Sequence, residues 1–363
     1  MKVVIAGGGT GGHLMPALAL AQAMSELDVS VEPVLVGAKR GVEASILPSR
    51  PYKHYLLSLQ PIYRREWWKN FRWPMLALKT KRECGVVLER ERPAVILGTG
   101  GYAAGPVLFW ALRRGLPVAI QEQNAFPGLT TRWLARRARQ VHLGFPEAAE
   151  HLRPGLDTAL YQFGNPITPP PEPRPEKVAA RAALGIPQDR PVVLVTGGSQ
   201  GARVINETIA ELLCSDGLDD VVLLWSTGKH GWEAYSHLHE PPGRTLRSFW
   251  DPIAEAYAAA DVVIGRAGAM TTAELCAWGL PSILIPLPSA AANHQQKNAE
   301  AMARAGAAAH ITESELTPTR LKAVLEHLLG NDSALGDMKL AASTRGRPDA
   351  ARNIAKEVLR LVS

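Results

Sequence analysis

Three glycine-rich segments are the parts of this chain whose residue types best suit the binding of phosphates or sugars. They read GGGTGGH from Gly7, GTGGYAAGP from Gly98 and GGSQGAR from Gly197, and each follows a short apolar run. Glycine reaches positive φ angles and leaves its amide uncovered, while a following helix directs its N-terminal amides to the same place. The sequence therefore predicts three strand-turn-helix units that bring backbone amides close to a ligand.

The first segment also satisfies the GxGxxG pattern of dinucleotide-dependent oxidoreductases, through Gly7, Gly9 and Gly12. That fingerprint needs an acidic residue at the end of the second strand, where its carboxylate binds the ribose. Here the second apolar run ends in VLVGAKR, which contains no acid, and no glycine turn is followed by GKS or GKT. An oxidoreductase and a P-loop nucleotidase are both disfavoured.

A fourth glycine turn lies in GRAGAMTTAE, from Gly265 to Glu274, which reads as a strand, a turn and a helix. The Glu274 carboxylate could chelate two ribose hydroxyls, or it could only complement the helix dipole. Asn293 to Gln296, with the sequence NHQQ, follow a later apolar run at the predicted carboxyl edge of the sheet. Their amides suit sugar hydroxyls, although a solvated helix start has the same composition.

The chain of 363 residues is long enough for two domains. Its short apolar runs lack polar alternation, which is typical of parallel strands buried on both faces. The segment NPITPPPEPRP, from Asn165 to Pro175, contains six prolines and predicts a stiff linker. We therefore predict an α/β protein with two doubly wound parallel-sheet domains. The expected boundaries are 1–164 for the first domain, 165–185 for the linker, 186–345 for the second domain and 346–363 for a final helix.

Basic residues are concentrated in the first half of the chain. Residues 1–165 hold 21 Lys and Arg against 12 Asp and Glu, whereas the remainder holds 19 against 22. Arg64 to Arg82 contain seven basic residues and one acid, and Arg132 to Arg139 contain four arginines. The aromatic residues interleaved in the first stretch are Trp67, Trp68, Phe71 and Trp73. This composition suits docking on an anionic membrane surface, and solvated helices with buried aromatics are the alternative.

Other partners and locations are constrained by what the sequence lacks. No nucleic-acid recognition motif accompanies the basic residues, so nucleic acid is not an expected partner. No apolar run reaches the roughly 18 to 20 residues that span a bilayer, and the first apolar run leaves no room for a signal peptide. We expect a cytoplasmic protein without a transmembrane segment.

Six segments taken together resemble the MurG family. They are GGGTGGH, GGYAAGP, EQN at Glu122–Asn124, GNP at Gly164–Pro166, GGSQGAR and RAGAMTTAE, in family order over most of the chain. MurG enzymes are peripheral-membrane transferases that move N-acetylglucosamine from UDP-GlcNAc to undecaprenyl-linked muramyl-pentapeptide, converting lipid I to lipid II in peptidoglycan synthesis. The resemblance implies a GT-B fold at the cytoplasmic face of the membrane, with the acceptor on the first domain and UDP-GlcNAc on the second. It also implies that the last helix returns to the first domain, and that other cell-wall synthesis proteins are partners.

The resemblance also assigns the substrate-binding residues. Ser199 would contact the UDP phosphates, the backbone of Trp250 the uracil, and Glu274 the ribose. The helix start along the diphosphate comprises Ala269, Met270, Thr271, Thr272 and Ala273. The GlcNAc contacts are Asn124 and Gln295, and the border of the sugar and acceptor sites is formed by Thr10, Gly11 and Gly12. Thr168 stands where the family often has an arginine. The sequence leaves open whether Thr168 makes the nucleotide contact of that arginine.

Displacement of UDP places negative charge on the leaving diphosphate, which backbone amides could stabilise. No DxD motif is present, so we expect transfer without a metal or other cofactor. His13 is the leading candidate for the base that deprotonates the muramyl 4-hydroxyl, because imidazole titrates near neutrality. Tyr102 would position the acceptor, and Glu122 is an alternative base. Another GT-B glycosyltransferase, a UDP-GlcNAc 2-epimerase and a non-catalytic nucleotide-sugar binding protein are the remaining interpretations.

Overall fold

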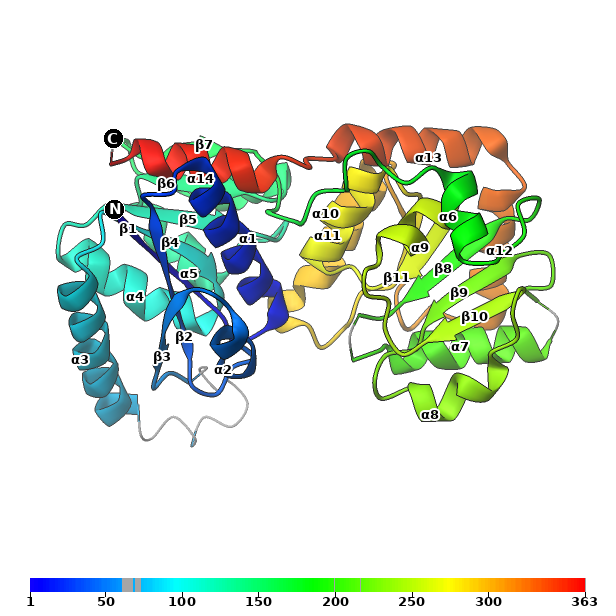
Figure 1. The fold of residues 1–363 in the computed structure, drawn as a ribbon, viewed down its shortest axis with the longest axis horizontal. Coiled ribbons are helices and arrows are strands. Elements are labelled where there is room, and N and C mark those ends of the chain that lie inside the picture. The colour runs from blue at the N-terminus through cyan, green and yellow to red at the C-terminus, as the bar shows by residue number, and fades with distance from the viewer. Residues whose placement is uncertain (61–67, 69–72, 199, 216, 363) are drawn as a thin grey trace. The chain divides into compact units, whose positions relative to one another are not determined.

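The computed structural model describes residues 1–60, 68, 73–198, 200–215 and 217–362. Contacts divide the chain into two compact units (Figure 1). The N-terminal unit comprises Met1–Thr168 and Pro348–Ser363, and the C-terminal unit comprises Pro169–Arg347. Each unit is a parallel sheet covered by helices on both faces, so the predicted α/β class with two doubly wound sheets is confirmed.

The sheet of the N-terminal unit has seven strands in the order β3-β2-β1-β4-β5-β6-β7. The strands are β1 (Lys2–Gly7), β2 (Glu32–Ala38), β3 (Lys53–Leu57), β4 (Val95–Gly100), β5 (Val118–Glu122), β6 (Gln140–Leu143) and β7 (Ala159–Tyr161). The helices are α1 (Gly11–Leu27), α2 (Glu43–Ile46), α3 (Trp73–Glu91), α4 (Gly101–Arg113), α5 (Leu129–Leu134) and α14 (Ala350–Arg360), with 3-10 turns at Leu47–Ser49 and Pro146–His151.

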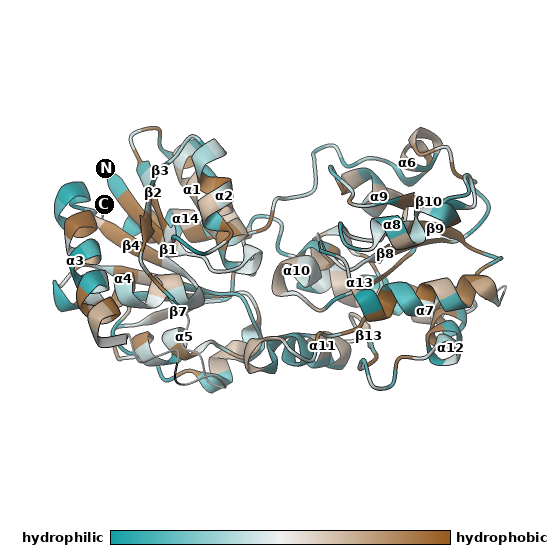
Figure 2. Ribbon diagram, turned by 90° about the horizontal axis from the view of Figure 1, so that it is seen from below, coloured by the Kyte–Doolittle hydropathy of each residue, from teal (hydrophilic) through white to brown (hydrophobic). Residues whose placement is uncertain are grey.

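Both faces of this sheet are buried, which explains the unbroken apolar runs. Along β1, Val3 and Ile5 belong to one core cluster with α1, and Val4 and Ala6 belong to the other, with α4. Figure 2 shows the hydrophobic residues along these strands. The C-terminal helix α14 lies beside α1 in Figure 1 and buries Ile354, Ala355 and Val358 in the first cluster. Gln140 on β6 also donates a hydrogen bond to the carbonyl of Glu357, at 3.0 Å.

The sheet of the C-terminal unit has six strands in the order β10-β9-β8-β11-β12-β13. The strands are β8 (Val192–Thr196), β9 (Val222–Ser226), β10 (Arg244–Arg247), β11 (Val262–Gly265), β12 (Ser282–Leu284) and β13 (Ala309–His310). The helices are α6 (Lys177–Ala183), α7 (Arg203–Cys214), α8 (Trp232–Tyr235), α9 (Ala254–Ala259), α10 (Ala269–Trp278), α11 (His294–Arg304), α12 (Pro318–Leu329) and α13 (Asp332–Arg345), with 3-10 turns at Ser236–Leu238 and Ala291–Asn293.

The strand order reverses between β1 and β4 in one sheet and between β8 and β11 in the other. Loops leave the carboxyl ends of neighbouring strands in opposite directions at such a point, which opens a crevice for ligands. The four glycine turns follow these same four strands. Among the described residues, no helix is both long and apolar enough to cross a membrane.

Glu91, the last residue of α3, ties this helix to two strands. Its buried carboxylate pairs with Lys2 of β1 at 3.0 Å and with Lys53 of β3 at 2.6 Å, and it accepts a hydrogen bond from the Tyr55 hydroxyl. Burial alone would raise the pKa of Glu91. The bonds from Lys53, Tyr55 and Lys2 outweigh that effect and lower the pKa to about 2. The charged carboxylate is therefore a structural tie at the amino end of β1.

His142 on β6 is a titratable group inside the core of the same unit. It is fully buried, it stacks on Tyr161 and Phe163, and its Nε2 lies 3.1 Å from Oε1 of Gln140. Burial lowers the pKa of His142 to about 3. The folded chain therefore holds a neutral imidazole at pH values where the unfolded chain binds a proton.

The stability of this unit is expected to fall with pH below the unfolded pKa of about 6.5 and down to about 3. From pH 7 to pH 5, protonation of His142 in the unfolded chain should remove about 2 kcal/mol from the free energy of unfolding. His142→Phe keeps an aromatic ring in the stack and should lose that part of the pH dependence. Urea unfolding at both pH values measures the difference, and identical pH slopes for the two proteins would contradict the prediction.

Candidate active site

The first two glycine turns form a single structure at the reversal point of the N-terminal sheet. Gly101 packs against the carbonyl oxygen of Gly8, and a Cβ on Gly101 would overlap that oxygen. A Cβ on Gly9 would lie 2.5 Å from the Tyr102 ring, and one on Gly100 would lie 2.7 Å from His13. Residues that lie about 90 positions apart in the sequence therefore build one surface.

His13 lies in the first turn of α1 and is held from two sides. Its Nδ1 is 2.9 Å from the hydroxyl of Thr10, and its carbonyl accepts a hydrogen bond from the Thr99 hydroxyl at 2.8 Å. Thr10, Gly11 and Gly12 are exposed, while the His13 ring is partly buried. The structure thus brings the predicted residues Thr10 to His13 and Tyr102 together.

A buried network of side-chain amides supports this surface from below. Gln123 donates to the carbonyl of Thr99 at 2.6 Å, and Asn165 donates to the carbonyl of Gln123 at 3.0 Å. Gln121 donates in turn to Oδ1 of Asn165 at 3.0 Å. Gln121, Gln123 and Asn165 were not among the predicted site residues, although they lie within or next to the EQN and GNP segments. The available signal was Gln121 at the end of the apolar run of β5, with Gln123 directly after the strand.

Glu122 lies at the end of β5 and is nearly fully buried. Its Oε2 accepts hydrogen bonds from Thr131 at 2.6 Å and from the Gly128 amide at 3.0 Å. Its Oε1 accepts from the backbone amide of Asn124 at 3.1 Å and from the Asn124 side chain at 3.3 Å. These contacts order the loop that carries Asn124, and they favour a positioning role for Glu122 over the role of base. Thr168 is exposed at the end of the N-terminal unit.

The third glycine turn follows β8 and packs on the loop after β9. A Cβ on Gly201, which has a φ of +82°, would overlap the carbonyl oxygen of Thr227. Asn206 on α7 donates to the same carbonyl at 2.7 Å and accepts from the Trp225 indole at 3.0 Å. The contribution of Thr227 was not predicted from the sequence. Ser199 lies outside the described residues.

The helix α10 begins at the reversal point of the C-terminal sheet, with Gly268 as its N-cap. The Thr272 hydroxyl donates to the carbonyl of Ala269 at 3.0 Å and is buried, so it faces the protein. Met270, Thr271 and Ala273 are partly exposed. Of the two threonines in the predicted site, Thr271 is therefore the one that a ligand can reach.

Glu274 lies one turn into α10 and is partly buried. The Tyr257 hydroxyl, buried in α9, donates to its Oε2 at 3.1 Å. Burial raises the pKa of Glu274, and the bond from Tyr257 acts in the opposite direction. No sequence pattern indicated this partner, because Tyr257 belongs to a different helix.

The two glutamines of NHQQ have different surroundings. Gln295 accepts a hydrogen bond through Oε1 from the backbone amide of Leu287 at 3.0 Å, which fixes the orientation of its amide. Gln296 donates to Glu300 at 3.1 Å, along the surface of α11. Gln295 is therefore held next to the loop after β12, whereas Gln296 is engaged within its own helix.

Trp250 follows β10, and its ring is buried. The Arg247 guanidinium lies over this ring at 4.1 Å from its centroid, and the indole nitrogen has no hydrogen-bond partner among the described residues.

The predicted site residues that the structure describes fall into two groups, one in each compact unit. Thr10–His13, Tyr102, Glu122, Asn124 and Thr168 belong to the N-terminal unit, and Trp250, Ala269–Glu274 and Gln295 to the C-terminal unit.

The structure describes only some of the residues that were predicted to contact the membrane. Trp68 is 58% exposed and Trp73 begins α3, while Trp67 and Phe71 lie outside the described residues. Further exposed apolar residues of the same unit are Met75 and Leu78 on α3, Phe109 on α4 and Trp133 on α5. Exposed basic residues lie beside them in sequence, at Lys79, Arg82, Arg132 and Arg136.

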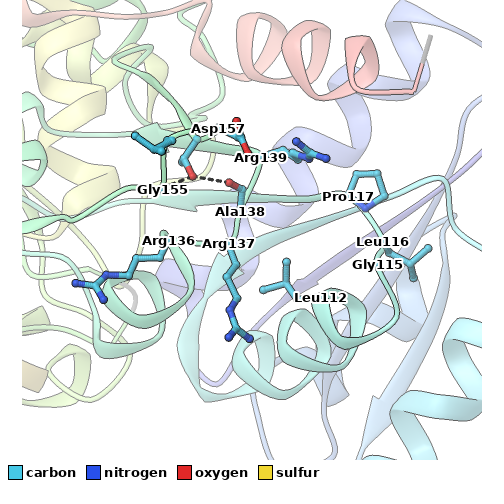
Figure 3. Close-up of a pocket in the computed structure, with 12 residues that line it drawn as sticks. Leu112, Gly115, Leu116, Pro117, Arg136, Arg137, Ala138, Arg139, Gly155 and Asp157 are labelled. Carbon is cyan, nitrogen blue, oxygen red and sulfur yellow. Dashed lines mark hydrogen bonds between the residues drawn. The ribbon is translucent and has the colours of Figure 1, made fainter.

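A cavity of about 320 Å³ lies elsewhere in the N-terminal unit (Figure 3). Residues just before β5, β6 and β7 line it, including Pro117, Arg139 and Thr158. These are the amino ends of the strands, whereas the glycine turns follow the carboxyl ends. The cavity is therefore at the opposite edge of the sheet from the candidate active site.

Two doubly wound parallel sheets, each with glycine turns and a helix start at its reversal point, are the GT-B fold. Residues 3–143 match the N-terminal domain of glycosyltransferase family 28, and residues 192–354 match its C-terminal domain. The chain belongs to the MurG family within this group, and the resemblance found in the sequence is confirmed.

A relative from Moorella thermoacetica is 42% identical over 100% of this chain and 99% of its own length. It is named UDP-N-acetylglucosamine--N-acetylmuramyl-(pentapeptide) pyrophosphoryl-undecaprenol N-acetylglucosamine transferase. The crystal structure of Acinetobacter baumannii MurG is similar with a TM-score of 0.78 and 27% identity, and 99% of each chain is covered. The calicheamicin glycosyltransferase CalG4 shares the fold, with a TM-score of 0.67 at 14% identity over 100% of this chain and 99% of its own.

The contact between Gly101 and the Gly8 carbonyl gives a stability prediction with a matched control. Gly101 and Gly115 have similar φ angles of +74° and +72°, but a Cβ on Gly115 would meet no atom within 4 Å. Gly115→Ala should cost roughly 1 to 2 kcal/mol, because an alanine is strained at that φ. Gly101→Ala should cost about 1 to 3 kcal/mol more, because the Gly8 carbonyl must move. Urea unfolding of both variants measures this difference, and equal losses of stability would count against the close contact.

Proposed function

We propose that this chain transfers N-acetylglucosamine from UDP-GlcNAc to the muramyl 4-hydroxyl of undecaprenyl-pyrophosphoryl-MurNAc-pentapeptide, with inversion at the anomeric carbon. The reaction converts lipid I to lipid II in peptidoglycan synthesis. The observation that carries the proposal is membership of the MurG family along the whole chain, at 42% identity to the Moorella transferase. The glycine turns at both reversal points support it, because they are suited to a nucleotide sugar and its acceptor.

On the donor side, the start of α10 is proposed to face the diphosphate of UDP. The N-cap of this helix is Gly268, which has no side chain, and the backbone amides of the first turn are proposed as fixed donors for the negative charge that develops on the leaving group. Glu274 would accept hydrogen bonds from the ribose hydroxyls, and an ionised carboxylate accepts them more strongly than a protonated one. Burial opposes ionisation of Glu274, and the hydrogen bond from Tyr257 favours it.

The GlcNAc contact is proposed for Gln295. Its Oε1 is already occupied by the amide of Leu287, so its Nε2 is the group that remains to donate to a sugar hydroxyl. The engagement of Gln296 with Glu300 supports the choice of Gln295 over its neighbour. Asn124, in the loop ordered by Glu122, is the second proposed sugar contact.

On the acceptor side, His13 is the proposed base. In the tautomer that has its proton on Nδ1, this N–H donates a hydrogen bond to the Thr10 hydroxyl oxygen, and the lone pair of Nε2 is the group that would accept the proton of the muramyl hydroxyl. Tyr102 packs against Gly9 beside this pair and is proposed to position the acceptor. A non-catalytic nucleotide-sugar binding protein would need the donor residues but not this arrangement.

Release of UDP from UDP-GlcNAc, with and without a lipid I analogue, tests the function. We expect release only with the acceptor, and it should persist in EDTA because backbone amides stabilise the leaving group.

His13→Ala should lower kcat by about 10² to 10⁴-fold with little change in the KM for UDP-GlcNAc. Glu274→Gln should instead raise that KM. Near-normal turnover by His13→Ala would remove it as the base, and no release in either condition would favour the binding protein.

We also propose that the N-terminal unit docks on the cytoplasmic face of the membrane, where its lipid-linked acceptor lies. Met75 and Leu78 on α3 are 76% and 70% exposed, and Lys79 and Arg82 are exposed on the same helix. Figure 2 shows the alternation of hydrophobic and hydrophilic residues along α3. Apolar side chains can enter the headgroup region while basic residues attract anionic lipids.

The double substitution Met75→Ser and Leu78→Ser should weaken binding to phosphatidylglycerol vesicles by at least about tenfold. Each apolar side chain that enters the membrane contributes roughly 1.5 to 3 kcal/mol to the binding free energy. Leu340→Ser on α13 is the matched control, since Leu340 is 68% exposed in the C-terminal unit. Vesicle sedimentation measures both. Equal affinities of the double variant and the control would remove α3 from the docking surface.

A further inference from the structure

A buried carboxylate lies behind the first glycine turn, and the proposed reaction assigns it no role. Glu43, the first residue of α2, has no exposed surface. Its Oε1 accepts hydrogen bonds from the backbone amides of Ala38 at 2.7 Å and Gly9 at 3.0 Å. Its Oε2 accepts from the same Gly9 amide at 2.9 Å. One side chain therefore joins the end of β2 to the turn that follows β1.

Three glycines make room for this carboxylate. Cβ atoms on Gly8, Gly37 and Gly41 would each overlap the Glu43 side chain. Gly9, which donates to it, has a φ of +94° and belongs to the same turn. Because backbone surrounds the carboxylate on several sides, its position and the shape of the turn determine each other.

The Gly9 amide is consequently directed into the protein. The sequence suggested that the amides of this turn approach a ligand, and for Gly9 that expectation is wrong, since Glu43 takes the hydrogen bond. The negative charge of Glu43 also disfavours an anion at the Gly8–Gly9 peptide. The turn therefore does not act there as a phosphate cradle.

The same turn leads directly into the proposed acceptor residues. Gly9 contacts the Tyr102 ring, the next residue is Thr10, and the Thr10 hydroxyl lies 2.9 Å from Nδ1 of His13. A shift of Gly9 would displace Thr10, and with it the partner of the imidazole.

We propose that Glu43 is a positioning residue for the acceptor half of the reaction. By holding the amides of Gly9 and Ala38, it fixes the turn from which Thr10 and His13 meet the acceptor hydroxyl. The inference rests on the proposed function, in which His13 removes the proton of that hydroxyl. Glu43 itself lies behind the backbone and does not touch the substrate.

Glu43→Gln is the informative substitution, because it keeps the volume and replaces one accepting oxygen by an NH2 group. If the amide oxygen takes the place of Oε1, the NH2 group faces the Gly9 amide, and two donors meet. We expect kcat to fall about 10- to 100-fold, since small displacements of reacting groups have effects of that size. The KM for UDP-GlcNAc should change little, because the proposed diphosphate and ribose contacts, Ala269–Glu274, belong to the other compact unit. Asn124, the proposed sugar contact in the same unit as Glu43, is ordered by Glu122 and not by Glu43.

Glu91→Gln is the matched control. It removes a second buried carboxylate of the same unit, which pairs with Lys2 at the opposite end of β1. This variant should lower the thermal midpoint without lowering kcat. Acceptor-dependent UDP release by the purified full-length proteins gives kcat and both KM values, and hydrogen exchange of the segment 7–13 reports the order of the turn.

Wild-type kcat in Glu43→Gln, or an equal loss of kcat in both variants, would overturn the proposal. Failure of the proposed function has a different signature, which is the absence of acceptor-dependent UDP release by the wild-type chain. Hydrogen exchange then still decides the role of Glu43, because faster exchange at residues 7–13 is expected only in Glu43→Gln. Unchanged exchange in that variant would overturn the inference independently of activity.

Discussion

Close packing of backbone on backbone, where β1 and β4 leave the sheet side by side, is the constraint on which the N-terminal half of the candidate site depends. The carbonyl of Gly8 occupies the space that a Cβ on Gly101 would fill, and Thr99 binds the carbonyl of His13 at 2.8 Å. Only glycine permits this approach, because it has no Cβ and accepts the positive φ angles found here. The contact turns two separate glycine segments into a rigid support for His13.

The C-terminal unit meets the same topological requirement with different contacts. Gly201 approaches the Thr227 carbonyl behind the third turn. The helix α10 follows the neighbouring strand β11 and has Gly268 as its N-cap. The carboxylates of Glu43 and Glu274, one in each unit, have different surroundings. Glu43 is enclosed by backbone and serves the fold of the turn, whereas Glu274 has one hydrogen bond from Tyr257 and is partly exposed. A carboxylate that binds a ligand needs that access, and one that positions backbone does not.

Buried polar groups connect the loops of the site to one another. Gln121, Gln123 and Asn165 lie in the core and join the ends of β4 and β5 to the GNP segment. Such groups are costly to bury unless each one finds a partner, and a satisfied network rigidifies the loops that it joins. The site is therefore supported by hydrogen bonds as well as by the apolar core beneath it.

The sequence by itself determined the parallel α/β class, the two sheets, the four glycine turns and the family, because these follow from local runs of residues and from motif order. It could not identify Glu43, Gln123 or Tyr257 as partners of site residues, nor decide that Thr272 faces inward. Each of these depends on hydrogen bonds that form only in the folded chain, between groups as far apart as Gly9 and Glu43 or Tyr257 and Glu274. Composition can place donors and acceptors in a segment, but only tertiary packing decides which of them remain available to a ligand.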